Sequence, residues 1–221
     1  MLTVHHLNNS RSQRVLWLLE ELELPYEIVR YQRQSDMRAP AELRAIHPLG
    51  KSPVITDNGN TIAESGAIIE YITEVYGDGH LIPRPRTRDR LRYTYWLHYA
   101  EGSAMSPLLL KLLFTLMPKR APALLRPVVR KVANQALTAL VNPMLKQHMA
   151  FWEGELGKSE WFAGDAFTAA DIQMSFPLEA AAARGGLDQG HPKAMAFLER
   201  IHARPAYQRA LEKGGPYSVG R

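Results

Sequence analysis

The most informative absence in this sequence of 221 residues is cysteine, of which there is none. Without cysteine the chain forms no disulfide, no thiolate metal site, no CxxC redox pair and no thiol nucleophile of its own. Any sulfur chemistry therefore needs a thiol brought by a ligand. Charge is not scarce, because 27 lysines and arginines outnumber 22 aspartates and glutamates and give a formal net charge of +5. That balance suits anionic ligands but decides nothing about the fold.

Long hydrophobic runs are also missing. The first residues, MLTVHHL, contain no basic region followed by an apolar stretch, so they predict no signal peptide. The longest apolar stretch, 107–118, is interrupted by Lys111 and Thr115 and is shorter than the ~20 residues of a transmembrane helix. We therefore expect no transmembrane segment and a cytoplasmic location. Since 46% of the residues are hydrophobic, we expect a folded chain rather than a disordered one.

The hydrophobic pattern of the first 78 residues predicts an α/β unit. Strand-like and helix-like segments follow in the order β-α-β and then β-β-α, at 2–6, 15–22, 26–31, 53–56, 61–63 and 65–77. A strand–helix–strand order predicts a parallel pair of strands with a right-handed crossover. Asn58-Gly59 separates the last two strands and is typical of a hairpin turn, whose residues must accept a positive φ.

The rest of the chain is expected to be helical. Gly and Pro are frequent over 77–85, which predicts a linker. Helical spacing then covers 90–106, 133–155, 169–184 and 192–204, with a short last turn around 206–213. We therefore predict a first domain over 1–78, a linker over 79–89 and an all-α domain over 90–221. The basic, proline-containing segment 108–132 stays unassigned.

Ser10 stands where the first strand turns into the first helix. One interpretation is structural: Ser10 caps the helix and Gln13 completes a capping box. The other is chemical, because a helix N-terminus offers unpaired N–H groups and positive potential. A serine hydroxyl there could donate to a ligand thiolate and lower the pKa of that thiol. The residues alone leave both interpretations open.

Two further motifs suit an anionic peptide with one α-amino-acid end. In Lys51-Ser52-Pro53 a proline begins a strand, which leaves the neighbouring backbone free for a ligand. By itself, however, Lys51 is interpreted as a surface charge and the bond before the proline as trans. Glu64-Ser65 begins a helix, either as a cap or as a site where Ser65 and the helix amides hold a carboxylate and Glu64 holds an ammonium group.

In order and spacing over nearly the whole chain, these residues resemble a glutathione transferase. The shared features are Ser10, Pro-Leu-Gly-Lys-Ser-Pro at 48–53, Glu64-Ser65 eleven residues after Pro53, a structural capping box Thr168-Ala-Ala-Asp171, and the ending Ala-Arg-Pro-Ala-Tyr-Gln-Arg-Ala at 203–210. The resemblance implies an α/β thioredoxin-like N-terminal domain plus an all-α helical C-terminal domain, usually as a homodimer. It implies glutathione as co-substrate, with no metal or other cofactor.

The resemblance also implies a reaction and a role for Ser10. Ser10 would hydrogen-bond the glutathione sulfur and hold it as the thiolate for attack on small hydrophobic electrophiles, a detoxification chemistry. Asn9 and Ser12 are the alternatives for this role. Because the chain has no cysteine and no suitably placed tyrosine near residue 10, the resemblance is to the serine-dependent, bacterial or theta-like branch.

The remaining glutathione contacts are carried over residue by residue. Ser52 would pair through its backbone with the cysteinyl residue of the tripeptide, beside a cis Pro53. Lys51 would meet the glycyl carboxylate, and Glu64 with Ser65 would hold the γ-glutamyl end.

The second substrate is expected between Ser10 and the helix over 96–106. On that helix a group of polar and aromatic side chains shares one face by i, i+4 and i, i+3 spacing: Tyr95, Tyr99, Ser103 and Ser106.

Other functions compete with conjugation. The fold could serve as a non-catalytic glutathione-binding or protein-interaction module, or as a glutathione-dependent peroxidase, dehalogenase or isomerase. Basic residues at 84–92 and 119–131 raise polyanion or membrane binding as a third possibility. Acidic residues elsewhere and the lack of a nucleic-acid-binding signature favour a solvated surface, so we expect no nucleic-acid partner.

Overall fold

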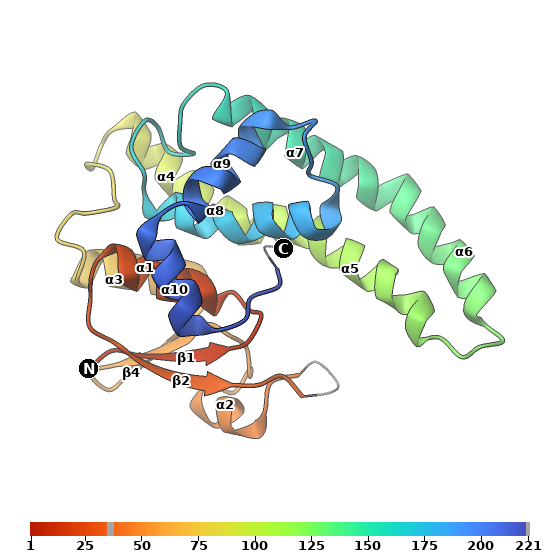
Figure 1. Ribbon diagram of the computed structural model, residues 1–221, viewed down its shortest axis with the longest axis horizontal. Helices are drawn as coiled ribbons and strands as arrows, with labels where there is room; N and C mark the ends of the chain where they lie inside the picture. The colour runs from red at the N-terminus through yellow and green to blue at the C-terminus, as the bar shows by residue number, and fades with distance from the viewer. Residues whose placement is uncertain (35–37, 220–221) are drawn as a thin grey trace.

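In the computed structural model, which describes residues 1–34 and 38–219, a four-stranded sheet packs against a larger body of helices (Figure 1). The strands are β1 (Thr3–Leu7), β2 (Glu27–Tyr31), β3 (Val54–Asp57) and β4 (Asn60–Ala63), in the order β2-β1-β3-β4. β1 pairs in parallel with β2 and antiparallel with β3, and β3 pairs antiparallel with β4. The predicted crossover unit and hairpin are confirmed, and both turn residues, Asn58 and Gly59, have a positive φ.

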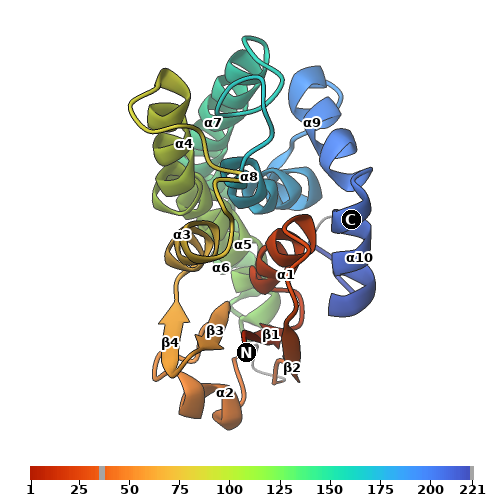
Figure 2. The same ribbon diagram turned by 90° about the vertical axis from the view of Figure 1, so that its left-hand side faces the viewer.

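Three helices cover the sheet. α1 (Ser12–Glu21) and α3 (Ser65–Val75) lie on the face turned toward the helical body, and α2 (Ala41–Ile46) lies on the other side (Figure 2). Val15–Leu19 of α1 are all fully buried, because the helix packs against the sheet, α3, α8 and α10. The apolar run of α1 is therefore enclosed by other elements along its length. The start of α1, with Ser10 before it, is therefore fixed by packing on every side.

The helical body begins with α4 (Arg88–Tyr99), which continues through a π-helical turn at Ala100–Ala104 into α5 (Met105–Arg120). α6 (Arg126–Ala136) likewise continues through a π turn at Leu137–Val141 into α7 (Asn142–Leu156). After these come α8 (Ala169–Ala180), a π turn at Ala181–Gly185, α9 (Pro192–His202) and α10 (Pro205–Gly214). No helix in the described part of the chain is both long and apolar enough to cross a membrane.

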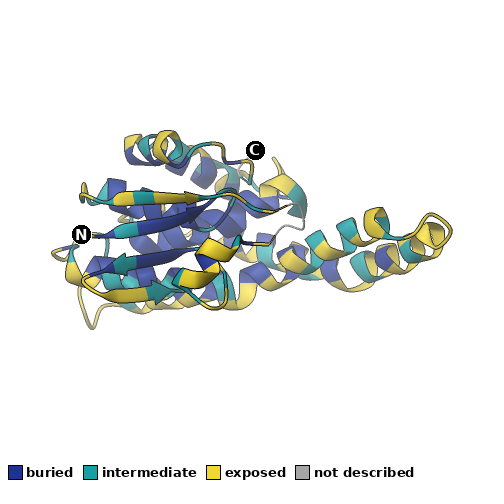
Figure 3. Ribbon diagram, turned by 90° about the horizontal axis from the view of Figure 1, so that it is seen from below, coloured by how far each residue is buried: buried dark blue, intermediate teal, exposed yellow. Residues whose placement is uncertain are grey.

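The segment that sequence patterns left unassigned, 108–132, forms most of a helical arm. α5 and α6 lie side by side and extend beyond the rest of the molecule, and their outer half is largely exposed (Figures 1 and 3). Pro127 fits this arrangement, since it stands in the first turn of α6, where its missing N–H costs nothing, whereas Pro118 stands inside α5 near its end. Leu124 in the connecting turn is 94% exposed.

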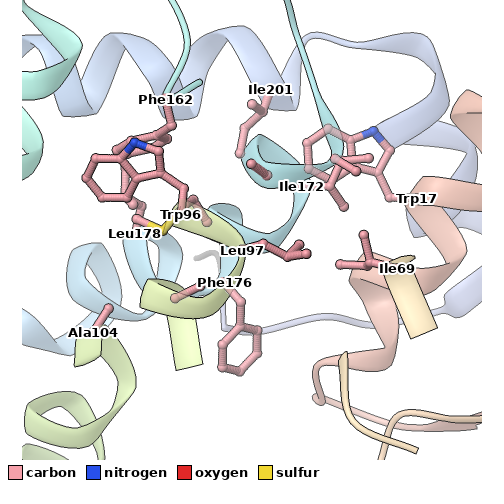
Figure 4. Close-up of a cluster of buried hydrophobic side chains, with 14 of the residues drawn as sticks. Trp17, Ile69, Trp96, Leu97, Ala104, Phe162, Ile172, Phe176, Leu178 and Ile201 are labelled. Atoms are coloured by element: carbon pink, nitrogen blue, oxygen red, sulfur yellow. The ribbon is translucent and has the colours of Figure 1, made fainter. Parts of the chain in front are cut away.

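One hydrophobic core joins the sheet-containing part to the helical body. Trp17 of α1, Trp96 of α4 and Ile172 of α8 belong to the same buried cluster (Figure 4). Every residue of α8 is buried, so it is the central helix of the molecule. The predicted capping box at its start, between Thr168 and Asp171, is present. Burial raises the pKa of Asp171 to about 6 even though Thr168 and two backbone N–H groups donate to it.

Candidate functional site

A cavity of about 630 Å³ opens between the sheet-containing part and the arm. The predicted glutathione residues share its wall: Lys51, Ser52, Pro53, Glu64 and Ser65. Across the cavity from them, Glu101 of the π turn and Leu109 of α5 complete the wall. The structure thus brings the segment 51–53 and the residues Glu64 and Ser65 to the wall of one cavity.

The Ser52–Pro53 peptide bond is cis, as the resemblance predicted. Pro53 directly precedes β3, which runs antiparallel to β1 with Val54 opposite His5, so the chain before Val54 lies toward the end of β1 that leads to α1. This pairing brings Ser52 close to Ser10, and the Ser10 hydroxyl donates to Ser52 Oγ over 3.1 Å. Ser52 in turn donates to the carbonyl oxygen of His5 in β1.

Ser10 lies immediately before α1 and is 4% exposed. Its oxygen accepts from the Ser12 backbone N–H at 3.2 Å. The capping box that one interpretation placed between Ser10 and Gln13 is not formed, because the Gln13 side chain has no hydrogen-bond partner and does not reach back. The reason is tertiary: a Cβ built on Gly214 of α10 would stand 2.5 Å from Gln13 Oε1, so that amide is directed at α10.

Asn9 and Ser12, the two alternatives to Ser10, both have side chains that are already hydrogen-bonded within the protein. Asn9 Oδ1 accepts from the backbone N–H and the hydroxyl of Ser218, near the C-terminus. Ser12 is completely buried, and its hydroxyl lies 2.7 Å from Ser10 Oγ and 2.9 Å from His6 Nδ1. Burial lowers the pKa of His6 to about 4, so this imidazole is neutral at pH 7. The hydrogen bonds of Ser12 with Ser10 and His6 therefore hold the Ser10 hydroxyl in position from its buried side.

Sequence reasoning missed Arg14, which is 1% exposed and organises one end of the cavity. It donates to Ser65 Oγ at 3.0 Å, to the carbonyl of Gln173 at 2.6 Å and to Glu101 Oε1 at 2.5 Å. Arg11 Nε donates to both oxygens of the same Glu101 carboxylate. Burial alone would raise the pKa of Glu101, but the two guanidinium groups outweigh it and the pKa is lowered. The signal in the sequence that could have pointed to Arg14 is its position directly before the apolar run Val15–Leu19.

Glu64 is exposed and stands just before α3, with a φ of 71°. This is the left-handed region, which residues other than glycine rarely enter and which tends to occur at functional sites. The conformation carries the chain from β4 into α3, so that the N-terminal amides of α3 and the buried Ser65 hydroxyl lie at the cavity.

The residues expected to form the second-substrate pocket do not line this cavity. The Tyr99 hydroxyl is bonded to His148 and accepts from Trp152 Nε1 at 3.1 Å, and Tyr95 stacks on the Tyr99 ring. Ser103 and Ser106 are exposed outside it. The expectation of one shared face assumed a regular α-helix, and the π turn at Ala100–Ala104 changes the number of residues per turn between the tyrosines and the serines.

Basic side chains dominate the cavity. They come from the start of α1, the segment after β2, α2 and the loop before β3: Arg11, Arg33, Arg38, Arg44, His47 and Lys51. Among the residues that the structure describes, the acidic side chains in the wall are Glu64 and Glu101. Among the described residues, no group of three or more His, Asp or Glu side chains could hold a metal ion.

Comparison with known proteins gives a consistent result. The family model described as "Glutathione S-transferase, N-terminal domain" matches residues 1–74, and that for the C-terminal domain matches 116–205. Glutathione S-transferase 3 of Schizosaccharomyces pombe is 35% identical over 96% of this chain and 88% of its own. Glutathione S-transferase 1 of Saccharomyces cerevisiae is 34% identical over 96% and 95%.

Two solved structures are similar over nearly their whole length. A glutathione S-transferase from Actinobacillus pleuropneumoniae has a TM-score of 0.79 and 31% identity, covering 100% of this chain and 96% of that one. A sphingomonad glutathione S-transferase complexed with glutathione has a TM-score of 0.74 and 25% identity, covering 96% and 98%.

Proposed function

Because the chain belongs to the glutathione S-transferase family, with a thioredoxin-like N-terminal domain and a helical C-terminal domain, we propose a serine-dependent transferase. In this proposal the Ser10 hydroxyl holds the glutathione sulfur as the thiolate for attack on an electrophile. The observation that carries it is the contact of Ser10 with Ser52 beside the cis proline, at the start of α1.

The ends of glutathione match the charges of the cavity wall. The γ-glutamyl carboxylate would be held by Ser65 Oγ and the N-terminal amides of α3, where the helix dipole favours an anion. Arg14 already donates to Ser65 Oγ and so fixes the position of that hydroxyl. Glu64 would accept from the ammonium group, and Lys51 would pair with the glycyl carboxylate. The backbone of Ser52 would bond the cysteinyl residue between them.

Three features near Ser10 would stabilise a thiolate. The dipole of α1 gives positive potential at its N-terminus, Arg11 adds a cation, and the Ser10 hydroxyl would turn from Ser52 to the sulfur. A hydrogen bond to a charged group contributes about 1.5–3 kcal/mol. That energy corresponds to lowering a thiol pKa of ~8.5 by about 1–2 units, so roughly a quarter to three quarters of the bound glutathione would be ionised at pH 7.

The test is Ser10→Ala, assayed with glutathione and 1-chloro-2,4-dinitrobenzene. We expect kcat/KM to fall by ~10–150-fold, the kinetic equivalent of the lost hydrogen bond, and the pKa of bound glutathione, followed by thiolate absorbance, to rise. Glutathione affinity should change little. Ser106→Ala, on an exposed serine outside the cavity, is the matched control.

The outcomes separate the competing functions. Undiminished turnover and an unchanged thiol pKa in Ser10→Ala would remove Ser10 from the mechanism. Glutathione binding by the wild-type chain without turnover on any electrophile would favour the non-catalytic binding module, and no binding would reject the proposed function altogether.

We also propose that the chain forms a homodimer through the arm. Large apolar side chains are exposed along both of its helices, and such contiguous patches mark interfaces: Leu109, Leu113, Met117, Val128 and Val132. Light scattering should then give twice the mass of 24.9 kDa, and Leu113→Asp should shift it to the monomer.

A further inference from the structure

After α10 the chain runs beside the turn that leads from β1 into α1 (Figure 1). It leaves the helix at Gly215, which has a φ of 83°, and we call residues 215–219 the strap. Within the strap, Ser218 donates to Asn9 Oδ1 through its backbone N–H at 2.8 Å and through its hydroxyl at 3.0 Å. Because Asn9 directly precedes Ser10, the strap is bonded to the neighbour of the proposed catalytic serine.

The strap is itself anchored to the helical body. Tyr217 is buried, and its hydroxyl donates to Glu179 Oε2 of α8 at 2.7 Å. Glu179 is 2% exposed and also accepts from the Tyr207 hydroxyl of α10 at 2.6 Å, through Oε1. Just before the strap, a Cβ built on Gly214 would stand 3.0 Å from Leu16 Cδ1 of α1, so the end of α10 lies directly against that helix. Both neighbours of the strap, α8 and α1, belong to the common core, which fixes where Ser218 stands.

Asn9 has a backbone conformation that needs support. Its φ of 50° lies in the left-handed region, which asparagine tolerates better than most residues but which still costs free energy. Such a conformation persists only where the surrounding structure holds it. Within the described chain, the hydrogen bonds of the Asn9 side chain are the two from Ser218, and its carbonyl oxygen accepts a longer one of 3.4 Å from Arg33. The strap therefore supplies the shortest contacts that hold Asn9.

The conformation of Asn9 controls the direction of the peptide that joins it to Ser10. The Ser10 oxygen lies 2.7 Å from Ser12 Oγ and 3.1 Å from Ser52 Oγ. A rotation of the peptide before Ser10 would move this hydroxyl relative to both partners. Misplacing a catalytic group by about 1 Å can cost about 100-fold in rate. Support of Asn9 is therefore also support of the position from which Ser10 would reach the sulfur.

We propose that the strap is a working part of the active site, in which Ser218 binds Asn9 and thereby positions the Ser10 hydroxyl to hold the glutathione thiolate. The inference rests on the proposed function and adds Asn9 and Ser218 to it as positioning residues that do not touch the substrate. Losing their contact should raise the pKa of the bound thiol and slow turnover. Glutathione affinity should change little, because the residues proposed to bind the two ends of the tripeptide come from other segments, 51–53 and 64–65.

Two single variants test the contact from its two sides. Asn9→Gly removes the acceptor but leaves a residue that enters the left-handed region freely. We expect kcat/KM with glutathione and 1-chloro-2,4-dinitrobenzene to fall about tenfold, and the pKa of bound glutathione, followed by thiolate absorbance, to rise by about half a unit to one unit. Ser218→Ala removes one of the two hydrogen bonds and should act in the same directions, lowering kcat/KM about threefold. The glutathione Kd from calorimetry should stay within about twofold in both.

A double-mutant cycle shows whether the two residues act through each other. In Asn9→Gly the Ser218 hydroxyl has already lost its acceptor, so adding Ser218→Ala should change neither kcat/KM nor the thiol pKa any further. The matched control is Asn58→Gly, the same substitution at another asparagine in the left-handed region, with a φ of 47°. Asn58 stands in the turn between β3 and β4 and does not line the cavity, so this variant should show wild-type kinetics and thiol pKa.

Three results would overturn the proposal: an unchanged thiol pKa in Asn9→Gly, even with a lower Tm; wild-type kinetics in Ser218→Ala; or losses that add in the double variant. The first would leave the strap a role in stability alone, and the second would mean that Asn9 acts without the strap, for example by meeting the sulfur itself. If Ser10→Ala leaves turnover and thiol pKa unchanged, it is the proposed function that fails. Because Ser218 is exposed, Ser218→Ala keeps the test decisive if Asn9→Gly does not fold.

Discussion

Replacing Glu101 by glutamine removes one negative charge while keeping the size of the side chain. Glu101 Oε1 lies 2.5 Å from Arg14 Nη2, and Arg11 donates to both carboxylate oxygens. The other partners of the buried Arg14, the Ser65 hydroxyl and the Gln173 carbonyl, are uncharged. Glu101→Gln therefore leaves the charge of Arg14 buried without a counter-ion.

The structure sets the size of the effect. Removing one partner of a fully buried pair costs about 3–5 kcal/mol, and removing one from an exposed pair about 0–1 kcal/mol. The Arg14 side chain is 1% exposed and that of Glu101 is 31% exposed, so we expect about 2–3 kcal/mol of lost stability. For a chain of this length that lowers Tm by about 4–12 °C.

The same ion pair predicts a pH dependence. Because the pKa of Glu101 in the folded protein is below its usual value of 4.5, the pair stabilises the fold above pH 4.5. The stabilisation is lost as the pH falls through the lower, folded-state pKa. The difference between wild type and Glu101→Gln should therefore be full at pH 7 and shrink as the pH approaches 3.

Urea and thermal unfolding from pH 7 to pH 3 measure the stability lost in Glu101→Gln and how that loss depends on pH. The matched control is Glu160→Gln, since the Glu160 carboxylate is 58% exposed and lies 3.9 Å from Arg200 Nε. We expect that change to cost less than ~1 kcal/mol at every pH. A loss in Glu101→Gln no larger than in the control, or a loss that does not shrink at low pH, would refute the reasoning.

Three further predictions concern stability. The buried His6 has a pKa of about 4 instead of 6.5, so the unfolded chain takes up the proton before the folded protein does as the pH falls. The free energy of unfolding should therefore fall by about 3 kcal/mol from pH 6.5 to pH 4. In urea titrations, His6→Asn should make the free energy of unfolding less dependent on pH over this range. Asp171→Ala removes the acceptor of two buried backbone N–H groups, including that of Thr168, and should cost about 2–4 kcal/mol by urea unfolding at pH 7. Gly214→Ala places a methyl group against Gln13 and should lower the free energy of unfolding by about 1–2 kcal/mol, most of which Gln13→Ala in the same chain should restore.

Several elements could be predicted because their signals lie within a few residues. The strand at 2–6, the Asn58-Gly59 turn and the Thr168–Asp171 capping box each depend on neighbours in the chain, and each is present in the structure. The arm was not predicted, because prolines in 108–132 argue against a helix unless it is known which turn each one occupies. Pro127 is tolerated in the first turn of α6.

The sequence by itself determined the order of the four strands and of α1 and α3, the absence of any protein thiol and the family. What surrounds Ser10 was decided only by tertiary structure. Arg14 and Glu101 meet across 87 positions of the chain, and Ser10 and Ser52 across 42. The expected pocket residues lie outside the cavity, with Tyr99 bonded to Trp152 in the core and Ser103 exposed. Such contacts follow from how α1, the sheet and the arm pack together, because no pattern within a single helix specifies which distant charge or hydroxyl it will meet.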